Sequence, residues 1–136
     1  MKAVRAEPGI SVILMAYNEE PLARDALRLT AQALSEIPGE HEIIFVDDGS
    51  HDRSHAIAVE AAPLLSVPTR VLRHEENQGS GAAKRTGFAA ARGDLVIAIP
   101  CDNPLSVPEL AAFAGAAQAA DIVCGYRPDR PGYSWR

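Results

Sequence analysis

The sequence is short of aromatic residues, of lysine and of positive charge, and each shortage excludes something. Aromatic residues fill 5% of the 136 positions while hydrophobic residues fill 47%, which predicts a core of aliphatic side chains. Two lysines accompany eleven arginines, and the formal net charge is −5 at pH 7. Because a general nucleic-acid-binding surface is basic, we expect no nucleic-acid partner.

Cysteine and long apolar runs are scarce as well. The two cysteines, Cys101 and Cys124, lack zinc-site spacing, and we expect two reduced thiols buried as small apolar residues. No apolar run approaches the roughly 20 residues of a membrane span, and no basic-then-apolar leader opens the sequence. These absences predict a cytoplasmic chain, at most peripheral at the inner face of a membrane.

What the sequence does contain is a regular alternation of apolar runs with segments of helical spacing. The runs lie at 10–16, 42–46, 69–73, 94–99 and 121–125, and the helical segments at about 20–37, 53–65, 82–92 and 106–119. This alternation predicts an α/β fold with three α/β/α layers and a mostly parallel sheet. We expect a single domain over 1–136, with its core at about 10–126 and a basic, aromatic tail at 127–136.

Two of the runs carry more specific expectations. The run at 95–99 is apolar throughout, which favours a strand buried on both faces, whereas the more polar run at 69–73 favours a strand near an edge. Ser106 and Glu109 have capping-box spacing and predict the start of the last helix.

Polar residues follow the predicted strands at the points where they end. They are Tyr17, Asn18, Glu19, Asp47, Asp48, Asp102 and Arg127. Because the carboxyl ends of parallel strands share one edge of a sheet, we expect these residues to gather there. Carboxylates suit ribose hydroxyls, base N–H groups and hard divalent cations, and arginine suits diphosphate oxygens. The pattern therefore predicts a site for a nucleoside diphosphate.

Plainer explanations remain open for each of these residues. Asn18 and Asp52 can be helix N-caps, the segment 47–50 can be a simple turn, and Asp102 can cap a turn before Pro104. The glycines of segment 79–84 lie at a predicted helix start, where backbone N–H groups bind anions. That segment lacks the spacing of a Walker A motif, so ligand contact and simple turn formation are both open for it.

Four segments, at 11–19, 43–52, 77–87 and 91–94, together resemble the family 2 glycosyltransferases. The nearest branch is similar to dolichol-phosphate mannose synthases and bacterial polyprenyl-phosphate glycosyltransferases. The resemblance implies a Rossmann-like GT-A domain that binds a nucleotide diphosphate sugar of the GDP-mannose or UDP-glucose type. It also implies inverting, metal-assisted transfer of the sugar to a polyprenyl phosphate or similar acceptor.

The same resemblance implies a set of nucleotide-sugar-binding residues: Tyr17, Asn18, Glu19, Val46, Asp48, Asp102 and Arg127. Among them, Asp48 would hold the base with Val46 packed beside it, and we expect Asp48→Ala to weaken nucleotide binding more than Asp47→Ala. Asp102 would bind Mg²⁺ or Mn²⁺, and Arg127 would reach the donor phosphates. The catalytic base stays unassigned.

The sequence departs from the family pattern at two positions. Pro100 stands where the family has the first aspartate of its metal motif, and Pro104 stands where a glutamine often follows. Family members also continue further, so we expect the C-terminal acceptor part to be lacking here, or supplied by a homo-oligomer or a partner chain. These departures leave open a second function, a non-catalytic domain that binds a nucleotide or a partner protein without sugar transfer.

Overall fold

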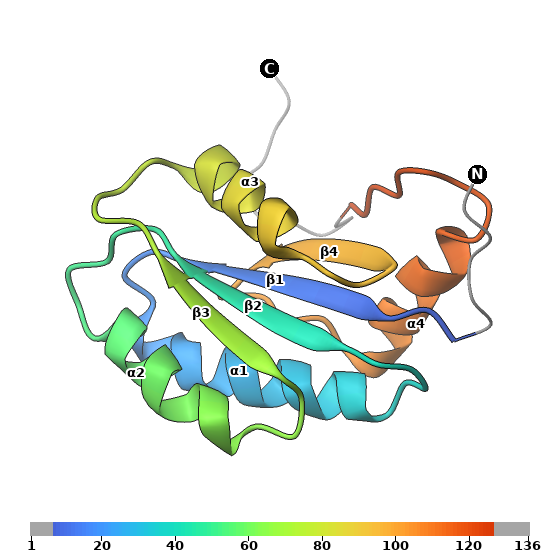
Figure 1. The fold of residues 1–136 in the computed structure, drawn as a ribbon, viewed down its shortest axis with the longest axis horizontal. Coiled ribbons are helices and arrows are strands. Elements are labelled where there is room, and N and C mark those ends of the chain that lie inside the picture. Colours follow the sequence, from blue (N-terminus) through green and yellow to red (C-terminus); the bar gives the residue numbers. More distant parts are fainter. Residues whose placement is uncertain (1–6, 127–136) are drawn as a thin grey trace.

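Four parallel strands form one sheet with helices on both of its faces in the computed structural model, which describes residues 7–126 (Figure 1). In chain order the elements are β1 (Ile10–Ala16), α1 (Glu20–Ser35), β2 (Glu42–Asp47), α2 (Ser54–Ala61), the 3₁₀ helix η1 (Ala62–Leu64), β3 (Thr69–Arg73), α3 (Ser80–Ala90), β4 (Leu95–Pro100) and α4 (Val107–Ala116). The strand order is β3-β2-β1-β4. The predicted three-layer α/β/α architecture is therefore confirmed.

The core divides into two parts, one on each side of the sheet. Val12 and Leu14 of β1 pack with Phe45 against the side covered by α1, α2 and α4. Ile13 points to the other side, where it packs with Val46 beneath α3. This alternation follows from the period-two geometry of a strand. It explains why the middle of β1 and of β2 is continuously apolar.

The two outer strands differ in how well the sequence predicted them. β3 is an edge strand, as its polarity indicated. The expectation that the run at 95–99 is buried on both faces is wrong, because β4 pairs only with β1 and most of its residues are half-buried. Among the described residues no element pairs with its outer edge.

The predicted fifth strand at 121–125 does not form. These residues carry no strand pairing, and they line a hollow of about 750 Å³ together with β4 and α4. Ile122 and Cys124 are exposed, so the prediction of two buried thiols holds only for Cys101. The tail at 127–136 lies outside the described residues.

The helix ends follow local chemistry. Ser106 and Glu109 form the predicted capping box at the start of α4, with the Ser106 N–H 2.7 Å from Glu109 Oε2. The segment predicted as one helix over 53–65 becomes α2 followed by η1, with Pro63 in the first turn of η1. Within residues 7–126 no helix is long and apolar enough to cross a membrane.

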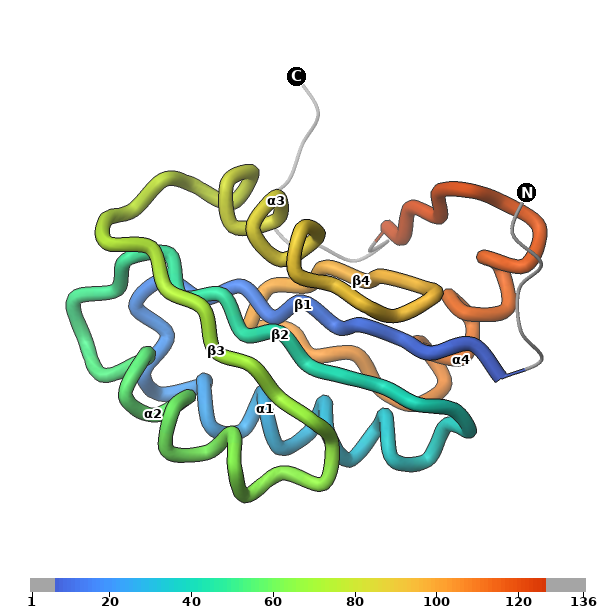
Figure 2. The backbone as a smooth tube through the Cα atoms, viewed as in Figure 1, coloured from blue at the N-terminus to red at the C-terminus, as the bar shows by residue number. Residues whose placement is uncertain are grey.

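The amino ends of the strands are tied together through one carboxylate. Glu42 accepts hydrogen bonds from Ser11 Oγ at 2.7 Å, from the Arg92 N–H at 2.7 Å and from Arg70 Nη2 at 2.8 Å. The pKa of Glu42 is lowered, because these hydrogen bonds and the charge of Arg70 outweigh burial, which alone would raise it. The carboxyl ends of β1, β2 and β3 lie together at the opposite end of the sheet, on the left in Figure 2.

Candidate functional site

The loops that follow β1 and β2 hold each other at the carboxyl edge of the sheet. The Asn18 N–H donates to Ser50 Oγ at 2.8 Å, and Asn18 Oδ1 accepts from the His51 N–H at 2.9 Å. The Glu19 N–H donates to Ser54 Oγ, also at 2.8 Å. Backbone donors at the start of α1, which have no partner within their own helix, are thus satisfied by side chains of the neighbouring loop.

The two residues predicted as N-caps contribute to this contact in different ways. Asn18 is not the cap of α1: Glu19 takes that position, and Asn18 has a φ of 52° with its side chain turned to His51. Asp52 accepts from the Ser54 N–H at 2.9 Å and from the Glu20 N–H at 3.1 Å. One carboxylate therefore stabilises the first turns of both α1 and α2.

Asp47 makes the turn that closes β2. Its buried carboxylate accepts from the hydroxyl of Ser50 and lies 3.3 Å from Arg73 Nε, while its carbonyl accepts from the His74 N–H at 2.9 Å. Every one of these contacts joins β2 to β3 or closes the turn itself. For Asp47, the simple-turn explanation is the one that the structure shows.

Asp48 has different partners and one unused acceptor position. Its side chain accepts from His74 Nδ1 at 2.7 Å and from the N–H groups of Gln78 and Gly79, both at 2.9 Å. Burial alone would raise its pKa, but these hydrogen bonds outweigh burial and lower it, so the group is ionised at neutral pH. An ionised carboxylate has about four acceptor positions, and three are filled here, leaving one on Oδ2.

The same hydrogen bonds distinguish ligand contact from turn formation at the start of the glycine-rich segment. The N–H groups of Gln78 and Gly79 are bound to Asp48 and are not available to a phosphate. Gly49 allows the approach, because it has a φ of 74° and a side chain there would overlap the backbone of Glu76 and Asn77. For these two amides, the turn-and-packing explanation holds.

Val46 is the predicted site residue that the structure buries completely. Its side chain is 0% exposed and packs with Ile13, Ile44 and Ala83 beneath α3. Val46 lies directly before the Asp47–Asp48 turn, so its packing beneath α3 holds this turn in place at the edge of the sheet. The resemblance implies that Val46 packs beside a base; in this structure its side chain has no exposed surface, and that role stays a prediction.

Two unpartnered carboxylates approach one another at the ends of β1 and β4. The Cys101 N–H donates to the Met15 carbonyl at 2.8 Å, which continues the pairing of β4 with β1 up to Asp102. Within the described residues neither Glu19 nor Asp102 has a side-chain hydrogen bond or ion pair. The pKa of Glu19 is raised by burial and then by the negative charges of Asp102 and Asp52.

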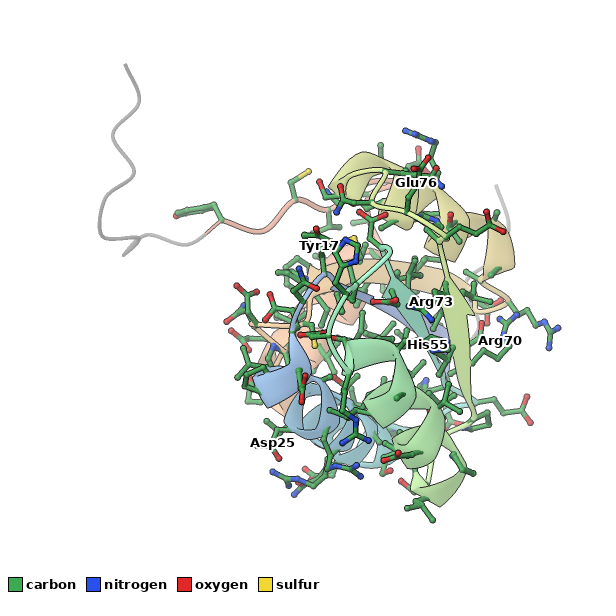
Figure 3. The ribbon with its side chains drawn as sticks, turned by 90° about the vertical axis from the view of Figure 1, so that its left-hand side faces the viewer. Tyr17, Asp25, His55, Arg70, Arg73 and Glu76 are labelled. Carbon is green, nitrogen blue, oxygen red and sulfur yellow. The ribbon has the colours of Figure 1, made fainter. Side chains whose placement is uncertain are left out.

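The charges of the same two carboxylates act on the thiol of Cys101. Burial, followed by the charges of Glu19 and Asp102, raises the pKa of Cys101 to about 12, so its thiol stays protonated and inert. Tyr17, which is 42% exposed, presents its ring at the same end of the molecule, which faces the viewer in Figure 3. Local negative charge beside an exposed aromatic ring makes this edge suitable for a cation and a nucleoside.

The chemistry of the carboxylates fits a hard divalent cation that takes further ligands from its substrate. No group of three or more His, Cys, Asp or Glu side chains that could hold a metal occurs in the described part of the chain. Mg²⁺ and Mn²⁺ accept one or two carboxylates and complete their shell with phosphate oxygens and water. Asp102, with Glu19 near it, fits this incomplete type of site. Arg127 lies outside the described residues, and its role stays a prediction.

Comparison with known proteins decides the family. The family model described as Glycosyl transferase family 2 matches residues 11–136. The chain belongs to glycosyltransferase family 2. It is 37% identical over 130 residues to undecaprenyl-phosphate 4-deoxy-4-formamido-L-arabinose transferase of Pseudomonas aeruginosa, covering 93% of this chain and 38% of that protein. The same enzyme of Pseudomonas fluorescens is 34% identical over 124 residues, which cover 89% and 36% of the two chains.

Solved structures confirm the GT-A fold of this family 2 chain. The mannosyltransferase PcManGT from Pyrobaculum calidifontis, in complex with GDP-Man and Mn²⁺, has a TM-score of 0.71 at 23% identity and covers 90% of this chain and 36% of its own. S. aureus TarS 1-349 in complex with UDP-GlcNAc has a TM-score of 0.65 at 28% identity, covering 79% and 30%.

A third neighbour is glucosyl-3-phosphoglycerate synthase from Mycobacterium tuberculosis in complex with Mn²⁺, UDP and glucosyl-3-phosphoglycerate. It has a TM-score of 0.65 at 25% identity and covers 85% of this chain and 42% of its own. The present chain spans well under half the length of the curated relatives that it matches.

Sequence reasoning missed two residues at the carboxyl edge of the sheet of this family 2 chain, His74 and Thr86. His74 follows β3 directly, so its place at a strand end was a usable signal, but a lone histidine has no motif around it. Thr86 lies within α3 and has no sequence signal at all. The structure joins both residues to Asp48, which the resemblance had already singled out.

Proposed function

We propose that this chain forms the nucleotide-sugar-binding part of a glycosyltransferase that transfers a sugar to a polyprenyl phosphate. The observation that carries the proposal is the carboxyl edge of the sheet, which holds Asp48 with one unfilled acceptor position and also the unpartnered carboxylates of Glu19 and Asp102. The activity for which the Pseudomonas relatives are named supports an undecaprenyl-phosphate-type acceptor. Such a lipid acceptor fits a protein that works at the inner face of a membrane.

The hydrogen bonds of Asp48 support uracil as the base of the donor. Uracil offers one imide N–H, which matches the single acceptor position left on Oδ2. Guanine offers two adjacent N–H groups and pairs best with both oxygens of a carboxylate, but the Oδ1 positions here are taken by His74 and Gln78. The UDP-GlcNAc complex of TarS, a neighbour at 28% identity, supports the same choice.

The remaining edge residues have roles that follow from their position. Tyr17 would pack against the nucleoside, and Asp102 would bind the divalent cation with Glu19 close to it. When bound, a Mg²⁺ or Mn²⁺ ion would stabilise negative charge on the departing diphosphate. The manganese in the glucosyl-3-phosphoglycerate synthase complex supports a cation of this kind.

The transfer itself is a single displacement at the anomeric carbon of the sugar. An oxygen of the acceptor phosphate supplies the electron pair of the new bond, and the bond from the anomeric carbon to the donor phosphate breaks. The nucleoside diphosphate leaves with that second pair of electrons, and the configuration inverts. A phosphate monoester is already largely ionised at pH 7, since its second pKa is about 6, so this acceptor needs no general base.

Isothermal titration of the 136-residue chain with UDP-sugars and GDP-sugars, each with and without Mn²⁺, tests the proposal. We expect a UDP-sugar to bind more tightly than its GDP counterpart, and Mn²⁺ to strengthen that binding. If neither series binds at millimolar concentration, the proposal is wrong. If the GDP-sugar binds more tightly, the assignment of uracil is wrong while the donor class stands.

A second candidate function is binding without transfer. It is favoured by Pro100, which ends β4 without a carboxylate where the family places the first acid of its metal motif. Sugar transfer to a short polyprenyl phosphate distinguishes the two. Turnover by the isolated chain excludes the non-catalytic alternative.

A further inference from the structure

The proposed base-binding carboxylate is connected to helix α3 through one histidine. The His74 side chain is only 10% exposed, and its Nδ1 lies 2.7 Å from Asp48 Oδ1. Its other ring nitrogen, Nε2, lies 2.7 Å from Thr86 Oγ1. Both ring nitrogens are therefore used, and the contacts run without a gap from α3 to the end of β2.

The chemistry of the three groups fixes where the protons are. Asp48 is ionised and can only accept, so the hydrogen between it and His74 must be on Nδ1. In the neutral ring Nε2 then has no hydrogen and accepts the hydroxyl proton of Thr86. In this tautomer Thr86 donates to His74, and His74 donates to Asp48; the hydrogen bond from Nδ1 to Asp48 is the same whether or not Nε2 carries a hydrogen.

We propose that His74 is a positioning residue for base recognition, which makes the unused Oδ2 position of Asp48 face the base of the donor. The proposal rests on the proposed function, because it concerns the same nucleotide. His74 fills one acceptor position of Oδ1, and the Gln78 N–H fills the other. The Asp48 carboxylate then has a single open position, in a single orientation.

Without His74 the Asp48 carboxylate would have more than one open acceptor position. The N–H groups of Gln78 and Gly79 would still hold one position on each oxygen, so one position on each oxygen would be open. The loop that supplies these two amides is held independently, because Arg73 Nη2 donates to the Ser50 carbonyl at 3.2 Å and the loop backbone packs on Gly49. Loss of His74 should therefore alter the recognition of the base more than it alters the fold.

The matched pair His74→Asn and His74→Gln separates the two ring contacts. The side-chain nitrogen of asparagine can take the place of Nδ1 and donate to Asp48, whereas the longer glutamine places its amide near the position of Nε2. His55→Gln is the control, because His55 lies on α2 with no side-chain hydrogen bond among the described residues. Thr86→Val removes the hydroxyl that orients the ring while keeping the shape of the side chain.

The readout is the ratio of UDP to CDP affinity, measured by calorimetry on the 136-residue chain. Cytosine has an acceptor nitrogen in place of the uracil N3–H, so UDP can make the imide hydrogen bond to the open Oδ2 position and CDP cannot. We expect His74→Gln to weaken UDP binding about tenfold, an effect of the size of one hydrogen bond to a charged group, because the Asp48 carboxylate is no longer held in one orientation, with CDP unchanged. His74→Asn should keep most of the ratio, Thr86→Val should lower it part of the way, and His55→Gln should leave it unchanged.

The possible results separate the positioning role of His74 from the proposed function. An unchanged UDP-to-CDP ratio in folded His74→Gln, or equal losses for both nucleotides, overturns the positioning role while leaving the proposed function in place. No UDP binding by the unmodified chain overturns the proposed function and this inference with it. If His74→Gln does not fold, Thr86→Val and the ¹⁵N spectrum of the His74 ring decide: a hydrogen on Nε2 in place of Nδ1 contradicts the proposal.

Discussion

At the scale of single residues, Asp47 and Asp48 are neighbours with different tasks. Both are buried at the end of β2. Asp47 contacts its own turn and Arg73, whereas Asp48 accepts hydrogen bonds from the loop at 74–79. The sequence shows only two adjacent acids. The different contacts of the two carboxylates could not be predicted from the sequence, because they depend on the side of the strand toward which each side chain points.

The first prediction compares Asp48→Ala with Asp47→Ala. Each removes a buried acceptor with several donors, so each should lower the free energy of unfolding by about 2 kcal/mol, measured in urea. Only Asp48 keeps a position open for a ligand, so UDP affinity should fall further in Asp48→Ala. Equal losses of UDP affinity at equal stability would contradict the assigned base site.

The second prediction concerns Asp102, whose carboxylate has no hydrogen bond or ion pair among the described residues. Asp102→Asn should leave the free energy of unfolding within about 0.5 kcal/mol of the unmodified chain, as is usual for an exposed position without partners. It should abolish the strengthening of UDP-sugar binding by Mn²⁺, measured by titration with and without the ion. Retention of the full manganese effect would move the metal to other ligands.

At the scale of elements, the loops after β1 and β2 act as one unit. The start of α1 receives its capping hydrogen bonds from Ser50 and Asp52 of the next loop and from Ser54, the first residue of α2. Sequence reasoning placed the Ser106–Glu109 capping box correctly, but Glu19 and Arg53, and not Asn18 and Asp52, hold the N-cap positions of α1 and α2. Cap patterns are local signals, and here the acceptors come from more than 30 residues away in sequence.

Ser54→Ala tests this mutual capping. The change removes the acceptor of the Glu19 N–H and should lower the free energy of unfolding by about 1 to 2 kcal/mol, the usual effect of losing a helix cap. Ser66→Ala is the control, because Ser66 is exposed and pairs only with the Ser35 hydroxyl. A urea titration of both variants measures the difference, and equal effects would mean that the two helix starts are independent.

The elements also show where sequence patterns stop being informative. The alternation of apolar runs correctly predicted four strands and their parallel order, since buried parallel strands are continuous apolar runs. The run at 121–125 is also apolar at its centre but forms no strand. Periodicity measures whether a segment could be buried in a sheet, whereas pairing needs a neighbour, and the outer edge of β4 stays unpaired among the described residues.

At the scale of the whole molecule, carboxylates hold both ends of the sheet. Glu42 joins the amino ends of the strands, while Asp48 and Asp52 join the loops at the carboxyl ends. In each of the three, burial acts to raise the pKa, and hydrogen bonds outweigh it and lower the pKa. The ionised forms are therefore bound more strongly in the folded state than in the unfolded chain.

The sign of the pH dependence follows from these lowered pKa values. Their contribution to stability is complete above the unfolded pKa values of 3.8 and 4.5, and it is lost as the pH falls through the lower pKa values of the folded chain. Glu42→Gln removes one of the three contributions, so it should lower the free energy of unfolding at pH 7. The difference from the unmodified chain should shrink as the pH falls below the unfolded value of 4.5, because Glu42 is then protonated in the unfolded chain while the folded chain still favours its ionised form.

Urea titrations at pH 7, 5, 4 and 3 measure this convergence. Glu60→Gln is the matched control, because Glu60 forms only exposed ion pairs with Arg24 and Arg53, which contribute little to stability. Its difference from the unmodified chain should be small at every pH. A Glu42→Gln difference that stays constant down to pH 3 would mean that Glu42 stabilises the sheet by its shape and packing, and that its charge, held by Ser11, Arg92 and Arg70, does not.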